Sequence, residues 1–105
     1  MPFQFSHIFQ NATDGRLVRR LKNGDFQAYG ILIRKYQYFV NSTAYKLTLD
    51  KAAGYNLAVE SMLALWNFRA AIPKSSGIRQ KGFLEFLREL IRFYFLLNRR
   101  HGVTD

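Results

Sequence analysis

Apolar residues recur three or four positions apart through three long segments of this 105-residue chain, and this spacing restricts its fold more than any other feature. Such a period places the apolar side chains along one side of an α-helix. Only two prolines interrupt the chain, and no segment alternates apolar and polar residues over the length of a β-strand. The sequence therefore predicts an all-α protein, a compact bundle of about four helices.

Polar residues that can cap helices mark where the first two helices begin. Thr13 and Asp14 can cap a short basic helix over residues 15–22, which an Asn-Gly pair then stops. Asp25 can cap a second, longer helix that we expect to end at about Leu47. Between residues 15 and 47 the chain is therefore expected to be almost entirely helical.

Two further helices are expected in the second half of the chain. Residues 50–55 are predicted to form a connection with a break at Gly54, and Asn56 is the expected N-cap of the third helix. A proline ends this region, and a loop rich in serine, glycine and positive charge follows over residues 74–82. The last helix is expected to cover residues 83–100.

A chain of this length supports one domain with one core. Hydrophobic residues make up 49% of it and aromatic residues 16%, so it carries enough apolar surface to bury a core. We expect the helical domain to span residues 14–101, between an N-terminal arm over residues 1–13 and a C-terminal tail over residues 102–105.

The residue types needed for catalysis or metal binding are missing or scattered. The chain has no cysteine, so it can form neither a disulfide nor a thiolate zinc site. His7 and His101 lie near opposite ends, and no glycine-rich phosphate loop occurs. We therefore expect no enzyme activity, no metal site and no cofactor.

The sequence also lacks the features of an exported or membrane protein. No basic run precedes an apolar core at the N-terminus, as it would in a secretory signal. No uninterrupted apolar run approaches the roughly 20 residues that cross a bilayer. These features predict a cytoplasmic protein without a membrane partner.

The chain is strongly basic, with 16 Lys and Arg residues against 7 Asp and Glu residues and a net charge of +9. Such an excess suits a polyanionic partner, which is nucleic acid first and an acidic protein face or an anionic membrane second. A basic surface without a specific ligand explains the charge about equally well.

Three ordered blocks of the chain resemble one bacterial protein family. Residues 17–40 read LVRRLKNGDFQAYGILIRKYQYFV, where the family commonly has LVRRLKNGDEQAFRELYRRY. Residues 47–69 read LTLDKAAGYNLAVESMLALWNFR, beside a family form LTGDREDAEDIVQEVFLKLWENR. The third block follows the family pattern FRAYLFRIARN at Phe83, Phe86, Leu87, Leu90 and Arg92. In these blocks the chain resembles region 2 of the sigma-70 family, extracytoplasmic-function type.

The resemblance implies a helical domain that joins core RNA polymerase to promoter DNA in transcription initiation. In the family, a DAED-x-x-QE pattern in the middle block places carboxylates and a glutamine against the polymerase clamp. This chain has AGYN at residues 53–56, followed by Val59 and Glu60, so only Glu60 keeps its charge. The polymerase-binding residues that the resemblance implies are Asn56, Val59, Glu60 and Leu63.

The resemblance also implies contact with the promoter −10 element. In the family, the loop before the last helix captures a base flipped out of the single-stranded non-template strand. The matching loop here combines cations with serines, which would suit a single-stranded phosphate backbone, although an ordinary solvated loop is an equally good interpretation. The expected DNA-binding residues are Lys74, Arg79, Lys81, Arg88, Arg92, Arg99 and Arg100.

A second interpretation is a degenerate sigma-like module that no longer initiates transcription. Its last helix carries a run of apolar residues too wide to face one core. Such a module would bind a protein partner or form a homodimer through apolar surfaces around Tyr55, Val59, Phe93 and Phe95. Family members normally also carry region 4, which reads the −35 element, and nothing in this sequence resembles it. The resemblance therefore implies either a fragment or a region 2 that acts alone or with a separate partner.

Overall fold

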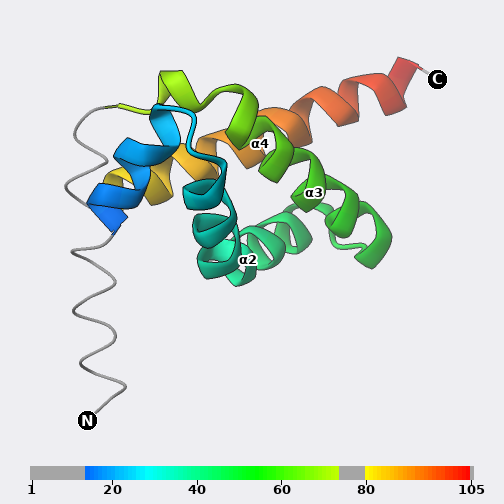
Figure 1. Cartoon of the computed structure of the whole chain (residues 1–105). Coiled ribbons are helices and arrows are strands. Elements are labelled where there is room, and N and C mark those ends of the chain that lie inside the picture. The colour runs from blue at the N-terminus through cyan, green and yellow to red at the C-terminus, as the bar shows by residue number, and fades with distance from the viewer. Residues whose placement is uncertain (1–13, 74–79, 105) are drawn as a thin grey trace, which may run out of the picture.

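The computed structural model describes residues 14–73 and 80–104. This part of the chain is built from four α-helices and contains no β-strand, which confirms the predicted all-α fold. The elements are a helix over residues 14–22, α2 (Phe26–Thr48), α3 (Lys51–Asn67), a 3-10 turn η1 (Arg69–Ala71) and α4 (Gln80–Thr104) (Figure 1). None of the described helices combines the length and the apolar character needed to span a membrane.

The start of α2 agrees with the prediction from the sequence. Asp25 is its N-cap, and the carboxylate accepts hydrogen bonds from the backbone N–H groups of Gln27 at 3.0 Å and Ala28 at 3.3 Å. The same carboxylate pairs with Arg20 of the preceding helix at 2.7 Å. These contacts fix the turn between the first two helices.

The start of α3 corrects the prediction. Residues 50–55 are not a connection, and Asn56 is not the N-cap, because Asp50 caps the helix by accepting from Ala53 N–H at 2.8 Å. Gly54 lies inside the helix and does not break it. A Cβ placed on Gly54 would lie 3.2 Å from both Tyr45 Cα and Thr48 Oγ1, so the glycine lets α3 approach α2 closely.

One core connects all four helices of the described part. All its members except Ile72, which follows η1, lie along the apolar stripe of a helix. The ring centres of Tyr36 and Phe83 lie 5.2 Å apart, edge to face, where α2 contacts α4. The α3 helix runs back along α2, and α4 crosses both (Figure 1). The core residues are Leu17, Val18, Leu21, Ala28, Leu32, Tyr36, Val40, Ala44, Leu57, Ala58, Leu65, Ile72, Phe83, Leu87 and Ile91.

A buried carboxylate links the first helix to α2. Asp14 is only 2% exposed, and it accepts hydrogen bonds from Lys35 Nζ and from the Tyr36 hydroxyl. Both donors lie on α2, so this polar contact holds the first helix in a fixed orientation beside the apolar residues of the core.

Candidate functional site

The residues predicted to contact a polymerase lie along one side of α3. Their spacing of three and four positions places them in consecutive helical turns. Asn56 and Leu63 are exposed, and Val59 and Glu60 are partly buried. Glu60 contacts α4, because its Oε1 accepts a hydrogen bond from Asn98 Nδ2 at 2.9 Å. The exposed part of this side is therefore mainly neutral.

Three of the predicted DNA-binding residues lie together on α4. Arg88, Arg92 and Arg99 are exposed, and their spacing of four and seven places them along one side of the helix. The Arg88 guanidinium lies 5.5 Å from the centre of the Phe39 ring of α2. Lys74 and Arg79 lie outside the described residues, and for Lys81 and Arg100 the structure describes the helical backbone alone.

The apolar surface predicted for a protein partner is divided between two places. Tyr55 and Val59 lie one turn apart on α3, and Tyr55 is well exposed. Phe93 is exposed on α4, with its ring edge to face with Tyr94 at 5.2 Å. Phe95 lies two positions further along the helix and therefore points to the other side, where it packs against the core.

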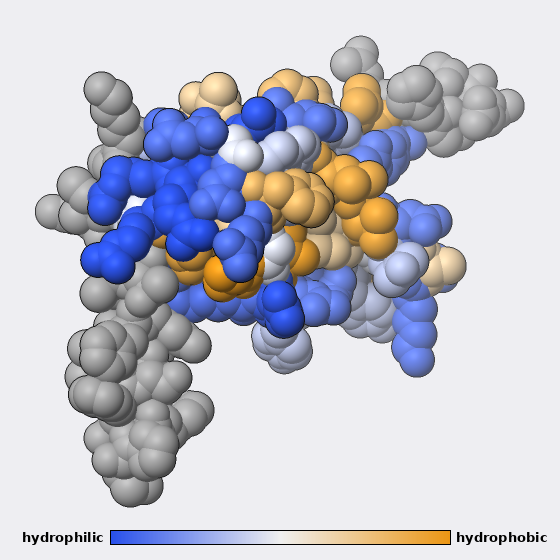
Figure 2. All heavy atoms as spheres, viewed as in Figure 1, coloured by the Kyte–Doolittle hydropathy of each residue, from blue (hydrophilic) through white to orange (hydrophobic). Residues whose placement is uncertain are grey.

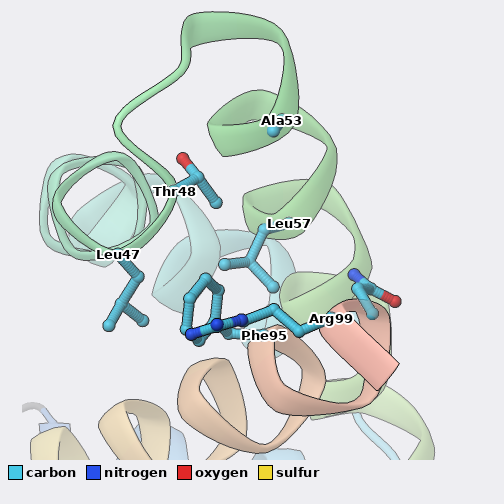
Figure 3. A pocket seen from close by; sticks show the side chains of 7 residues that line it. Leu47, Thr48, Ala53, Leu57, Phe95 and Arg99 are labelled. Atoms are coloured by element: carbon cyan, nitrogen blue, oxygen red, sulfur yellow. The ribbon is translucent and has the colours of Figure 1, made fainter. Parts of the chain in front are cut away.

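Phe95 lines a pocket of about 400 Å³ between the end of α2, the start of α3 and the last part of α4 (Figure 3). Arg99 lies across the ring of Phe95, with the guanidinium carbon 5.7 Å from the ring centre. An apolar floor with one cation at its rim suits an apolar group that lies next to a negative charge. The lining residues are Leu47, Thr48, Ala53, Leu57, Phe95, Asn98 and Arg99.

An aromatic cluster that sequence reasoning missed lies where α2 begins and α3 ends. The centre of the Phe26 ring lies 5.5 Å from the ring centre of Tyr29 and 5.2 Å from that of Trp66, and the Phe26 and Trp66 rings meet edge to face. Arg69 stacks on Trp66 with its guanidinium carbon 4.0 Å from the ring centre. The spacing of three between Trp66 and Arg69 is a local signal that could have revealed this stack, but only the folded chain brings Phe26 next to it.

The pKa values of Tyr29 in this cluster and of Asp25 beside it are both shifted. Burial raises the pKa of the Tyr29 phenol above its ordinary value, and the Tyr29 hydroxyl donates to the backbone carbonyl of Met62. The hydrogen bond from Arg20 is the main reason that the pKa of Asp25 is lowered, and the backbone N–H of Ala28 adds to it. Neither shift assigns a proton-transfer role, because Asp25 caps a helix and Tyr29 is a packed residue.

Within residues 14–73 and 80–104, no three His, Asp or Glu side chains lie close enough together to hold a metal ion. No protein-family model, curated protein or solved structure matches the chain. Its function must therefore be argued from its own residues and their arrangement.

Proposed function

We propose that this chain is a sigma region 2-like module that binds core RNA polymerase and single-stranded promoter −10 DNA, and that it is not an enzyme. Three blocks of sequence resemblance in the family order support the proposal, together with the net charge of +9. The NGD turn of the first block, residues 23–25, precedes a helix in this chain, and its Asp25 is the N-cap of α2.

The observation that supports the proposal is that the implied contact residues lie on two different helices, and that both helices carry exposed members of the set. Asn56, Val59 and Leu63 lie along α3, and the arginine row of α4 lies on another helix. A module that joins a protein to DNA needs two such surfaces, one suited to each partner. The neutral character of the α3 side means that its contact with polymerase would depend on apolar burial more than on charge.

Co-purification of the chain with core RNA polymerase tests the first surface. The variant Leu63→Arg places a charge on an exposed position of the α3 side, and Glu60→Lys reverses its one negative charge. Tyr38→Ala is the matched control, because Tyr38 is 83% exposed on α2. We expect the wild type and Tyr38→Ala to bind, and both α3 variants to bind weakly. Absence of wild-type binding at low salt contradicts the proposal.

Salt-dependent binding of a single-stranded −10 oligonucleotide tests the second surface. Replacing Arg88, Arg92 and Arg99 by alanine should reduce the slope of log K against log salt by about 0.7 for each phosphate that the variant no longer neutralises. Lys46→Ala removes an exposed cation from α2 and serves as the control. An unchanged slope in the triple variant contradicts the assignment of DNA contact to α4.

The exposure of Tyr55 and Phe93 favours a second candidate function, a sigma-like module that binds a protein partner or a second copy of itself. Light scattering during size-exclusion chromatography measures the molar mass of the chain in solution and so its oligomeric state. A dimer that Tyr55→Ser or Phe93→Ser dissociates would support this candidate, whereas a monomer that binds polymerase supports the first.

A further inference from the structure

An exposed aromatic ring lies at the corner formed by the helix over residues 14–22, the start of α2 and the end of α3. Phe26 is 67% exposed, although its ring centre lies 5.2 Å from that of Trp66, with the two rings nearly perpendicular, and 5.5 Å from that of Tyr29. Two neighbouring rings therefore contact Phe26, and most of its surface is still open to solvent. A flat apolar surface held in one orientation is suited to stacking against another flat ring.

Cations from two elements converge on this corner. Arg69 stacks on Trp66 and donates to the Trp66 carbonyl at 2.8 Å, and its Nη2 lies 3.8 Å from where a Cβ on Gly24 would be. Lys22 donates from Nζ to the carbonyl of Ile72 at 2.6 Å, so it bridges the first helix to the segment after η1. Both cations therefore lie close to the turn that leads into Phe26.

The charge around the corner is positive. Arg20 is paired with the Asp25 carboxylate at 2.7 Å. Lys22 and Arg69 instead donate to neutral backbone carbonyls, which do not cancel their positive charges. Arg16 and Arg19 are exposed on the first helix. Figure 2 shows strongly hydrophilic side chains gathered over the helix 14–22, beside apolar side chains that lie further along the same face.

We propose that this corner binds single-stranded nucleic acid, with one base stacked on the Phe26 ring and the neighbouring phosphates against Lys22 and Arg69. Every base has a flat face, so stacking on an aromatic ring tolerates any sequence, and nearby cations attract the backbone. An exposed aromatic ring bordered by several cations is better suited to binding single-stranded nucleic acid than to binding another protein. The inference goes beyond the proposed function, because it requires neither RNA polymerase nor the arginine row of α4.

Trp66 provides a direct probe, because it is the only tryptophan of the chain and it contacts Phe26. Titration with the unlabelled oligonucleotides dT12 and rU12 at low salt is followed by tryptophan fluorescence, and affinity is measured by anisotropy of labelled copies. We expect both oligonucleotides to change the Trp66 fluorescence and to bind more tightly than a duplex of equal length. A clear preference between them would distinguish a DNA ligand from an RNA ligand, and both belong to the proposed class.

The variant Phe26→Ala should weaken binding about tenfold. Phe26→Tyr should retain most of the affinity, because it keeps the ring. Tyr38→Ala is the matched control, since it removes a still more exposed ring from the same helix and should leave binding unchanged. Circular dichroism verifies that all three variants fold. Equal affinities of the wild type and Phe26→Ala, or an equal loss in Tyr38→Ala, would overturn the proposal.

The arginine row of α4 separates this inference from the proposed function. Alanine at Arg88, Arg92 and Arg99 should leave the Trp66 signal on dT12 binding in place. If that triple variant loses all binding while Phe26→Ala loses none, the nucleic-acid contact lies on α4 and the corner site is refuted. Absence of oligonucleotide binding by the wild type at low salt refutes the corner site as well, without bearing on polymerase binding.

Discussion

Replacing Asp14 by alanine should destabilise the fold more than any exposed substitution, because Asp14 is nearly inaccessible to water. Its side chain is hydrogen-bonded to Lys35 and Tyr36, and the Lys35 side chain is itself only 16% exposed. Removing one partner of a buried ion pair costs about 3–5 kcal/mol. Because Lys35 keeps some contact with water, we place the loss at about 2–4 kcal/mol, which lowers the melting temperature by roughly 10 °C or more in a domain of this size.

Urea unfolding followed by circular dichroism measures this loss, and a double-mutant cycle identifies its origin. The single variants Asp14→Ala and Lys35→Met are compared with the double variant, and we expect a coupling free energy of about 1–3 kcal/mol. Asp14→Asn keeps the size of the side chain and should fall between the wild type and Asp14→Ala. A loss below about 0.5 kcal/mol for Asp14→Ala would show that the first helix is held by its apolar contacts, and additive single variants would show that the Asp14–Lys35 pair contributes nothing.

Two further predictions concern the packing of α2. Gly54→Ala should destabilise the fold by about 1–2 kcal/mol, although alanine is the better helix former, because its Cβ would lie 3.2 Å from Tyr45 Cα. Urea unfolding measures this loss, and a variant more stable than the wild type would show that α2 and α3 separate easily. The raised pKa of Tyr29 means that folding favours the protonated phenol, so its contribution is present below about pH 10 and is lost as the pH rises through the raised value. The stability difference between the wild type and Tyr29→Phe should therefore shrink as the pH rises above about 10, and a constant difference would contradict that assignment.

Features fixed by nearby residues could be predicted from the sequence, and features fixed by tertiary contacts could not. The start of α2 was predicted correctly because an aspartate cap acts on N–H groups two and three residues away. The start of α3 was not, because Asp50 and Asn56 are both good caps and the glycine between them is typical of a helix break. In the folded chain Gly54 stays inside the helix, where the absence of a Cβ lets α3 approach α2 closely.

The candidate surfaces show the same division. The spacing of Arg88, Arg92 and Arg99 by itself places them on a shared side of α4, because helix geometry alone determines it. The contact between Phe26 and Trp66 joins residues 40 positions apart and depends on how α3 packs on α2. In the same way, Phe93 and Phe95 are close together in the apolar run, but only the position of the core decides which of them is exposed.

Only Leu49 and Asp50 separate α2 from α3, and this short connection affects the order in which the protein can fold. Closing so small a loop costs little chain entropy, so the two helices can pair through local contacts. During synthesis the pair is complete once residue 67 has emerged, before any of α4 is available. Until α4 arrives, the apolar side chains that it will cover on the nascent chain remain open to water, and in that interval the chain is most exposed to aggregation.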